Sequence, residues 1–228
     1  PDNLQVCARV GGELWLFGDR SIEIWSNIGA TDFPFLRSSG GLVARGTAAR
    51  ASLAVRANTA TWLGDDRVVY TAANAQPQRI STHAIEQAIA GYSVVSDAYG
   101  WTYEQDGHAF YVLTFPTAEA TWVFDFASGL WHERESEGLG YWRACFGVAF
   151  AGGVIAGDAE SGAIWRIAPT ASLEGSATII RTATGTAFHS EANPVFFSRF
   201  ALEFQAGVGL TTGQGSDPVE WLSWSNDG

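Results

Sequence analysis

The chain contains no lysine and no methionine, so all 13 of its basic residues are arginine. Only 16% of the residues are charged, and 24 acidic residues give a formal net charge of −11 at pH 7. Because like charges repel, this balance argues against broad contact with the phosphate backbone of a nucleic acid. We therefore expect little direct DNA binding.

Cysteine is almost absent as well. Cys7 and Cys145 are the only two, and they stand far apart and outside any Cys-x-x-Cys spacing. This argues against a disulfide framework, and we expect two reduced thiols in a protein that is assembled in the cytosol. No apolar run approaches the roughly 18 residues that a membrane-spanning helix needs, and the chain does not begin like a signal peptide. We expect no membrane partner.

Glycine and large aromatic residues are plentiful, with 26 Gly, 10 Trp and 14 Phe. This composition is typical of short strands with large side chains, joined by tight turns. With 46% hydrophobic residues, a chain of 228 residues can bury a sizeable core and falls at the upper end of one all-β domain. We therefore expect a single domain over residues 1–228. Because methionine is absent and the chain begins at Pro1, we also expect that it is a domain or a fragment of one from a longer chain.

A short pattern recurs along the chain. Leu16–Asp19, Trp62–Asp65 and Ile155–Asp158 all end in Gly-Asp, and each follows one apolar strand and precedes another. Gly-Asp at such a place is typical of a hairpin turn, in which we expect glycine to take positive φ and aspartate to bond to nearby amides. The first two copies are 46 residues apart, and the second and third are 93 apart, close to twice 46.

This spacing predicts another copy near residue 110. There Phe110–Phe115 and Thr121–Phe126 are expected to be strands, and a turn containing Pro116 replaces Gly-Asp. A fifth copy is expected at Leu202–Phe204. Hairpin units with a period in the forties are typical of β-propeller blades. We predict an all-β fold, a β-propeller of about five antiparallel blades and up to seven in a longer protein, with a less regular segment near residues 169–200.

A propeller blade buries its faces against the neighbouring blades, so large side chains are expected there. We assign five aromatic residues to these layers, in preference to a carbohydrate-stacking role: Trp15, Trp62, Tyr111, Trp122 and Trp165.

One short helix is expected to interrupt the strands. Apolar residues recur at helical spacing from Ile85 to Tyr92, Thr82 is suited to the N-cap, and Gly91 lies near the expected end. This predicts a helix over residues 83–91 that packs on the edge or face of the propeller.

Motifs that carry catalysis are missing from the sequence. The four histidines never pair at metal-ligand spacing: His83, His108, His132 and His189. No nucleophile elbow, P-loop or dinucleotide fingerprint occurs, and the glycine-rich segment Gly207–Gly215 lacks a phosphate-binding ending. We expect no catalytic residue, no cofactor and no metal site.

Propellers do include glycosidases, which need two carboxylates about 5–10 Å apart. Three aspartates follow the repeat and are expected to shape turns: Asp19, Asp65 and Asp158. Three others do not follow it and are the remaining candidates for catalysis: Asp66, Asp97 and Asp125. At the end of the chain, Ser223–Gly228 begins like an Asp-box, a structural hairpin turn that is common in propellers.

One stretch of the acidic chain, residues 33–64, has no acidic residue. Its arginines are the candidate contacts with another subunit or a partner protein, with a DNA contact as the alternative: Arg37, Arg45, Arg50 and Arg56.

Taken in order along the chain, a set of motifs resembles the phage stabilisation protein family. The segments that carry the resemblance are Glu13–Gly18, Ile24–Trp25, Asp32–Phe35, Trp62–Gly64, Arg79–Thr82, Ala84–Glu86, Gly107–His108, Tyr111–Pro116, Gly129–Arg134, Glu203 and Gly207–Gly209. They cover nearly the whole chain. The sequence departs from the family in its missing N-terminal start and its incomplete C-terminal turn.

This resemblance implies a packaged-DNA stabilisation protein, or tail hub, of a short-tailed phage. Such a protein is added after DNA packaging, closes the portal channel, and links the portal-side ring to distal tail proteins such as a needle, tailspike or fibre. The resemblance implies no catalytic residues in this chain, because the family has none. We expect a homo-oligomeric ring in the virion tail, assembled in the host cytoplasm, with the four arginines as subunit or tail contacts. A host-glycan binding module and a glycoside-hydrolase domain remain open as alternatives.

Overall fold

The computed structural model describes residues 2–185, 196, 198–199, 201 and 221–224. The chain divides into two units, Pro1–Pro169 and Thr170–Gly228. In the second unit the described residues include a two-stranded ribbon of β16 (Leu173–Glu174) and β17 (Ala177–Thr178). The expectation of one domain over the whole chain stays a prediction.

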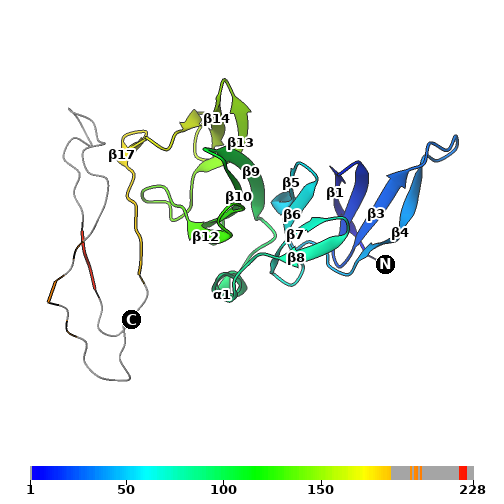
Figure 1. Cartoon of the computed structure of the whole chain (residues 1–228), viewed down its shortest axis with the longest axis horizontal. Helices are drawn as coiled ribbons and strands as arrows, with labels where there is room; N and C mark the ends of the chain where they lie inside the picture. Colours follow the sequence, from blue (N-terminus) through cyan, green and yellow to red (C-terminus); the bar gives the residue numbers. More distant parts are fainter. Residues whose placement is uncertain (1, 186–195, 197, 200, 202–220, 225–228) are drawn as a thin grey trace. The chain divides into compact units, whose positions relative to one another are not determined.

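The first unit consists of four antiparallel sheets in chain order, which we call blades 1 to 4 (Figure 1). Blade 1 comprises β1 (Leu4–Val10), β2 (Glu13–Gly18), β3 (Ile22–Asn27) and β4 (Phe35–Val43). Blade 2 comprises β5 (Ala54–Arg56), β6 (Thr59–Leu63), β7 (Val69–Ala73) and β8 (Gln76–Arg79). Blade 3 comprises β9 (Tyr99–Gln105), β10 (His108–Phe115), β11 (Ala120–Asp125) and β12 (Leu130–Glu133). Blade 4 comprises β13 (Ala144–Phe150), β14 (Gly153–Asp158) and β15 (Ile164–Ile167).

In each blade, consecutive strands pair with one another, so that every blade is a meander. The first strands of successive blades contact one another: β1 with β5, β5 with β9, and β9 with β13. Sheets that meet along their first strands have the arrangement of propeller blades around an axis. The all-β class and the antiparallel blades are thus confirmed, and the total number of blades stays a prediction.

The first two strands of every blade are joined by a two-residue turn. These turns are Gly11–Gly12, Ala57–Asn58, Asp106–Gly107 and Ala151–Gly152, and the first residue of each has a φ between 47° and 60°. A positive φ at this position matches the twist of the flanking strands. Successive turns are 46, 49 and 45 residues apart, which confirms the predicted period.

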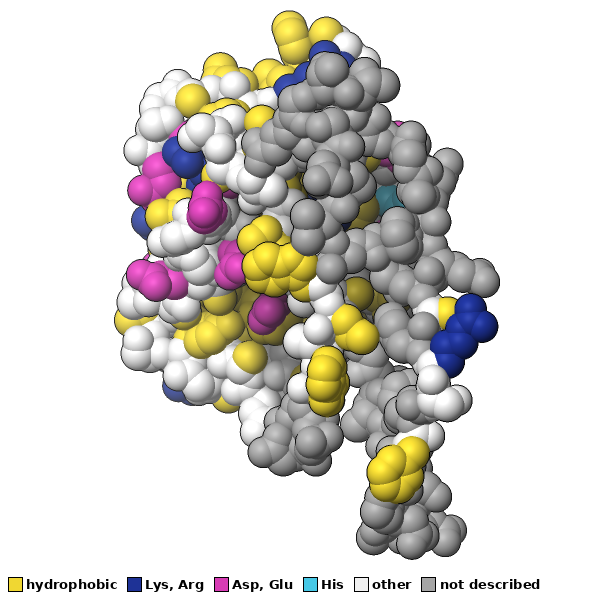
Figure 2. Space-filling model, turned by 90° about the vertical axis from the view of Figure 1, so that its left-hand side faces the viewer, with side chains coloured by type: hydrophobic (Ala, Val, Ile, Leu, Met, Phe, Trp, Pro, Cys, Tyr) yellow, Lys and Arg dark blue, Asp and Glu magenta, His cyan; other side chains and the backbone are white. Residues whose placement is uncertain are grey.

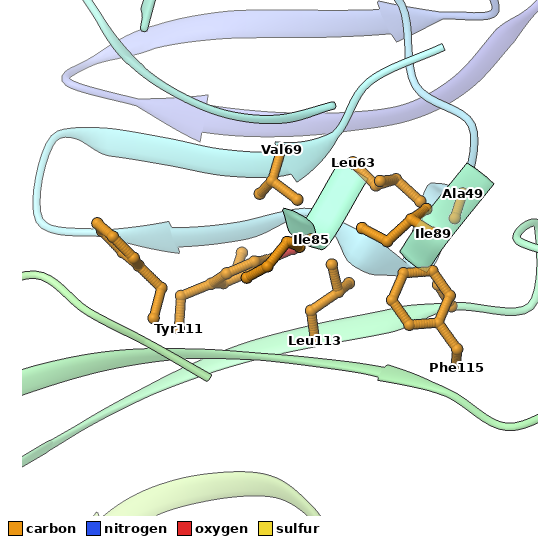
Figure 3. Packing of buried hydrophobic residues seen from close by; sticks show 11 residues of the cluster. Ala49, Leu63, Val69, Ile85, Ile89, Tyr111, Leu113 and Phe115 are labelled. Carbon is orange, nitrogen blue, oxygen red and sulfur yellow. The ribbon is translucent and has the colours of Figure 1, made fainter. Parts of the chain in front are cut away.

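The hydrophobic cores lie between blades. Blades 1 and 2 enclose one that includes Trp15, Phe17, Ile24, Trp62 and Tyr70. Blades 2 and 3, with the helix, enclose a second that includes Leu63, Val69, Ile85, Ile89, Tyr111, Leu113 and Phe115, most of which converge in Figure 3. Blades 3 and 4 enclose a third that includes Trp101, Tyr103, Val112, Val123, Trp142, Val154 and Ala156. Each blade is therefore stabilised by its neighbours.

Three of the five aromatic residues assigned to these layers are fully buried: Trp15, Trp62 and Tyr111. Trp122 is half-buried and packs against the core between blades 2 and 3. Trp165 is also half-buried, and it lies beneath the guanidinium of Arg143, whose Cζ is 5.5 Å from its ring centroid.

The one α-helix among the described residues, α1 (His83–Gly91), has the bounds that the sequence predicts. The Thr82 side chain accepts a hydrogen bond from the Ile85 amide, and Ile85 and Ile89 are buried between blades 2 and 3. At the other end, Arg67 Nη1 donates to the carbonyls of Ile89, Ala90 and Tyr92 over 3.0 to 3.3 Å. The favourable interaction of a cation with a helix C-terminus stabilises this end.

The expectation of positive φ at the repeated glycines is wrong, because Gly18, Gly64 and Gly157 all lack it. Close approach gives a reason for glycine at two of these positions. A Cβ on Gly64 would lie 2.7 Å from both Asp66 Oδ1 and the Tyr70 ring, and one on Gly18 would overlap the Asp2 carboxylate. In the Gly-Asp turn of blade 2, between β6 and β7, the residue with positive φ is Arg67, at 63°.

Several sequence-based expectations fall on residues outside the described ranges. These are the fifth repeat at Leu202–Phe204, the glycine-rich segment Gly207–Gly215, His189 and the end of the Asp-box-like segment Ser223–Gly228. The less regular segment near residues 169–200 is described only in part, and it stays a prediction.

Candidate functional site

The four arginines of the acid-free stretch lie on different elements. Arg37 is on β4 and forms an exposed ion pair with Glu23 of β3, with 3.2 Å between Nη1 and Oε1. Arg45 follows β4, and its Nε donates to the Tyr70 hydroxyl over 3.1 Å. The same nitrogen lies 3.4 Å from Asp66 Oδ2. The hydrogen bond with Tyr70 and the nearby Asp66 charge raise the pKa of Arg45.

Arg56, at the end of β5, forms an ion pair of 3.1 Å with Glu104 of β9. Its guanidinium also lies over the ring of Phe126, 5.1 Å from the centroid. Arg50, by contrast, is exposed in a one-turn 3-10 helix, Arg50–Ser52, and has no ion pair with a described residue. Acids within the same molecule thus neutralise Arg37, Arg45 and Arg56, and Arg50 alone presents its charge freely among the described contacts.

In a different constellation, one buried carboxylate organises each of two turns. The sequence predicted that Asp158 shapes a turn, but it revealed neither the role of Arg143 there nor the similar role of Asp125. Asp158 Oδ1 accepts from the Glu160 amide over 3.1 Å, and its Oδ2 accepts from the Ser161 hydroxyl. Arg143 donates two hydrogen bonds to the same carboxylate, of 2.8 Å from Nε and 2.7 Å from Nη2. The Asp158 side chain is fully buried, and the Arg143 bonds lower its pKa well below the ordinary value.

Asp125 repeats this arrangement in blade 3. Its carboxylate accepts from the Ala127 amide over 2.9 Å and from the Ser128 hydroxyl over 2.7 Å. His108 takes the place of arginine, with its Nδ1 2.8 Å from Asp125 Oδ2. Burial acts to raise the pKa of Asp125, but these hydrogen bonds outweigh it and lower the pKa to about 2. The signal in the sequence is Asp-x-x-Ser-Gly, which occurs at both places as DFASG and DAESG.

The three aspartates that remained candidates for catalysis all accept hydrogen bonds from other residues of the chain. Asp66 accepts from the Tyr70 hydroxyl over 2.8 Å, and Asp97 accepts from the Thr117 amide over 2.9 Å. Asp125 is held by its own turn and by His108, as described. These bonds use the carboxylates to fix turns and connections, which favours a structural role for each of them.

Arg134 is surrounded by aromatic rings at the junction of blades 3 and 4. Its Cζ lies 4.8 Å from the Trp142 centroid, 5.5 Å from that of Phe110 and 5.7 Å from that of Tyr103. Its Nε donates to His132 Nε2 over 3.1 Å, which requires this histidine nitrogen to be unprotonated. Burial, reinforced by the Arg134 charge, lowers the pKa of His132. Arg134 therefore acts as a packing element between blades.

Two hollows in the described part of the chain lie beside turns. One, of about 400 Å³, is lined by Arg56, Glu104, Gln105, Asp106, Gly107, His108, Ala109, Phe126 and Ala127. The other, of about 390 Å³, is lined by Thr59, Thr71, Ala72, Ala73, Asn74, Gln76 and Gln78. Because Arg56 already covers the Phe126 ring, the first hollow lacks a free aromatic platform of the kind that binds sugars.

No group of three or more histidine, cysteine, aspartate or glutamate residues suited to a metal ion is found in the described part of the chain. Within that same part, no helix is both long and apolar enough to cross a membrane. Among the described residues on the face seen in Figure 2, acidic, basic and hydrophobic side chains are intermixed. The described residues on this face thus carry mixed charge and no patch of one sign.

Comparison with known proteins agrees with this picture. A protein-family model described as "Bacteriophage P22 Gp10, beta-propeller" matches residues 1–172 of the 228. A search of the curated proteins gave no match. The matched residues include all four blades of the first unit.

Proposed function

Because the chain belongs to the phage stabilisation family, we propose that it is a tail hub, or plug, that closes the portal channel of a bacteriophage virion and stabilises the packaged DNA. Membership in this family makes it a phage structural protein, and it carries the proposal. Its proposed location is the virion tail, which it joins after assembly in the host cytoplasm. It works without a cofactor and catalyses no reaction.

The architecture supports a mechanical role. A plug has to resist the pressure of packaged DNA, so its parts must not slide past one another. The cores between blades, the Arg143–Asp158 pair and the Arg134 cluster all join one strand or blade to the next. Close-packed interfaces of this kind transmit strain rather than yield to it.

The proposed partners are other tail proteins: a portal-side adaptor, a tail needle, and a tailspike or fibre. The protein is further proposed to form a homo-oligomeric ring, which needs two different, complementary patches on each subunit. Arg37, Arg45, Arg50 and Arg56 are proposed contacts with a neighbouring subunit or tail protein. Arg50 is the best suited of them, because Glu23, Asp66 and Glu104 already occupy the other three.

Deletion of the gene tests the hub itself. Heads made without this protein are expected to package DNA and then lose it, and plasmid-borne supply of the protein should restore retention. DNA retention is measured as nuclease-resistant DNA per purified head. Infectious, DNA-retaining particles from the deleted phage would show that the hub assignment is wrong. Release of reducing sugars from host glycans by the purified protein would favour the glycoside-hydrolase alternative instead.

Charge reversal tests the arginine contact separately. Arg50→Glu should weaken attachment of the protein to heads that lack it, and added salt should weaken the parent's attachment in the same way, because exposed charges are screened. Arg9→Glu, at an exposed position on β1, is the matched control. Equal attachment of the parent and Arg50→Glu would exclude Arg50 as a contact and leave the hub assignment standing.

A further inference from the structure

A bulge interrupts the pairing of β3 with β4 before the end of their hairpin. Up to Glu23 and Leu42 the two strands pair regularly, but the next pair is Trp25 with Arg37. A single residue of β3, Ile24, therefore faces four residues of β4, Ser38–Gly41. Bulges of this kind bend the strand that contains the extra residues. We call the ribbon beyond this bulge, residues 25–37, the outer ribbon.

Two glycines fit the chain to this bulge. Gly40 has a φ of 74°, which side chains rarely allow, and a Cβ on Gly41 would lie 2.9 Å from the carbonyl oxygens of Ile24 and Ser38. In Figure 1 the connection between β3 and β4 extends away from the rest of the sheet. The outer ribbon is therefore a projection that the backbone specifies.

The tip of the outer ribbon is apolar and open to solvent. Ile28, Phe33 and Leu36 are 55%, 62% and 58% exposed. Phe33 stands edge-on to both Trp25 and Phe35, with 6.2 Å between ring centroids in each case. Single exposed apolar residues are ordinary, but three of them on one short projection, next to the ring cluster of Trp25, Phe33 and Phe35, are typical of a protein-binding surface.

The tip is also internally ordered. The Ile28 amide donates to the Pro34 carbonyl over 2.7 Å, and the Gly29 amide donates to Asn27 Oδ1 over 2.9 Å. A surface held in its binding shape before contact loses less entropy on association. The order of the tip therefore favours a role in recognition.

Charge at the ribbon narrows the choice of partner. Arg37 is paired with Glu23, whose other oxygen accepts from Trp25 Nε1 over 3.1 Å. Asp32 is then the one charged residue between Asn27 and Leu36. A tip without free positive charge offers nothing to a phosphate backbone, and its aromatic residues are of the kind that anchor protein interfaces in pockets.

We propose that the tip of the outer ribbon, with Ile28, Phe33 and Leu36, inserts into an apolar groove on another protein of the virion tail. This inference rests on the proposed function and specifies one of its contacts. A second copy of the chain is a poorer partner, because the two hollows described above are lined by charged, polar and small residues, and the one large apolar side chain among them, Phe126, is covered by Arg56. The exposed apolar face of blade 4, which includes Val148 and Phe150, is also a poor site for the tip of a second copy, because in a propeller a neighbouring blade covers a sheet face of this kind.

The test uses heads from phage that lack the gene, mixed with the purified full chain. Ile28→Asp and Phe33→Ser should each reduce the apparent affinity for these heads by about thirtyfold or more, which is the range of an interface hot spot. Phe33→Leu, which keeps an apolar anchor, should restore most of the binding. Leu130→Ser, at a 67% exposed position on β12, is the matched control and should bind like the parent.

The thermal midpoints of the variants show whether a loss of binding is caused by unfolding of the protein. Ile28 is 55% exposed and its hydrogen bond to Pro34 uses the backbone amide, so Ile28→Asp decides the matter if Phe33→Ser lowers the midpoint. Parent-like binding by Ile28→Asp would overturn the inference and leave the hub standing. Self-association of the parent that Ile28→Asp abolishes, with head binding retained, would also overturn it in favour of a second copy. Failure of the parent to join the heads would overturn the proposed function and this inference together.

Discussion

Tyr111, on the second strand of blade 3, donates a hydrogen bond of 2.7 Å to the carbonyl oxygen of Ser52, in the connection that leads into blade 2. The phenol is completely buried, and burial raises its pKa far above the ordinary value. Gly100 makes the contact feasible, since a Cβ at that position would overlap the same carbonyl. The Tyr111 side chain thus links blade 3 to the backbone of the connection that leads into blade 2.

Tyr111→Phe should destabilise the protein by about 1–3 kcal/mol, because it leaves the buried Ser52 carbonyl without a donor. A loss of that size corresponds to a fall in the thermal midpoint of about 2–4 °C per kcal/mol for a domain of this length. Tyr141→Phe is the control, since the Tyr141 hydroxyl bonds to the exposed Glu160 carboxylate. Equal midpoints for the two variants would mean that the Tyr111 bond contributes nothing specific.

Arg143→Gln should cost about 2 kcal/mol or more, because it strips the fully buried Asp158 carboxylate of its charged partner. Arg37→Gln breaks an ion pair whose side chains are 54% and 37% exposed, and should cost less than about 1 kcal/mol. Urea unfolding measures both. A larger loss from Arg37→Gln than from Arg143→Gln would contradict this ranking.

The stability of the protein should fall in acid through Asp125. Its pKa is about 2 in the folded protein against an ordinary 3.8, so the folded state binds this proton less readily than the unfolded state. The contribution of Asp125 is therefore complete above the ordinary pKa and is lost as the pH falls from about 4 to about 2. Unfolding free energies of the parent and Asp125→Asn across this range should converge in acid. A constant gap between the two would show that the carboxylate charge is not responsible.

Gly46→Ala should be strongly destabilising. The residue lies between blades 1 and 2, where its amide donates to Asp65 Oδ1 over 3.0 Å and its carbonyl accepts from Trp62 Nε1 over 3.1 Å. A Cβ would overlap the Asp19 carbonyl group, and we expect a loss of about 1–3 kcal/mol. Gly91→Ala, with open space around its Cβ position, should change stability by less than about 0.5 kcal/mol. Similar thermal midpoints for both variants would refute the close packing at Gly46.

Local patterns revealed the blades and the helix because the interactions that define them are local. Strands joined by two-residue turns recur at a nearly constant period, and the helix follows from the spacing of Ile85 and Ile89 behind Thr82. The positive φ at the Gly-Asp repeats was predicted wrongly. What selects glycine at Gly64 is the approach of the Tyr70 ring, a contact that the turn pattern does not encode.

The ion-pair partners of the arginines could not be predicted from the sequence. Arg37 pairs 14 residues back, and Arg56 pairs 48 residues ahead in another blade. A stretch without acids therefore looked like a basic surface, although folding brings acids to three of its four arginines. The Asp-x-x-Ser-Gly turns were visible in the sequence, but their partners, His108 and Arg143, come from other strands.

The placement of the cores between blades has a consequence for how the chain is made. A ribosome delivers blade 1 while the residues that will cover Trp15 and Phe17 from blade 2 are still unsynthesised. Each new blade completes the core of the one before it, so the nascent chain carries one uncovered apolar face at its growing end. Slow translation of the connections between blades would prolong this exposure and raise the demand for chaperones, whereas pauses inside a blade would not.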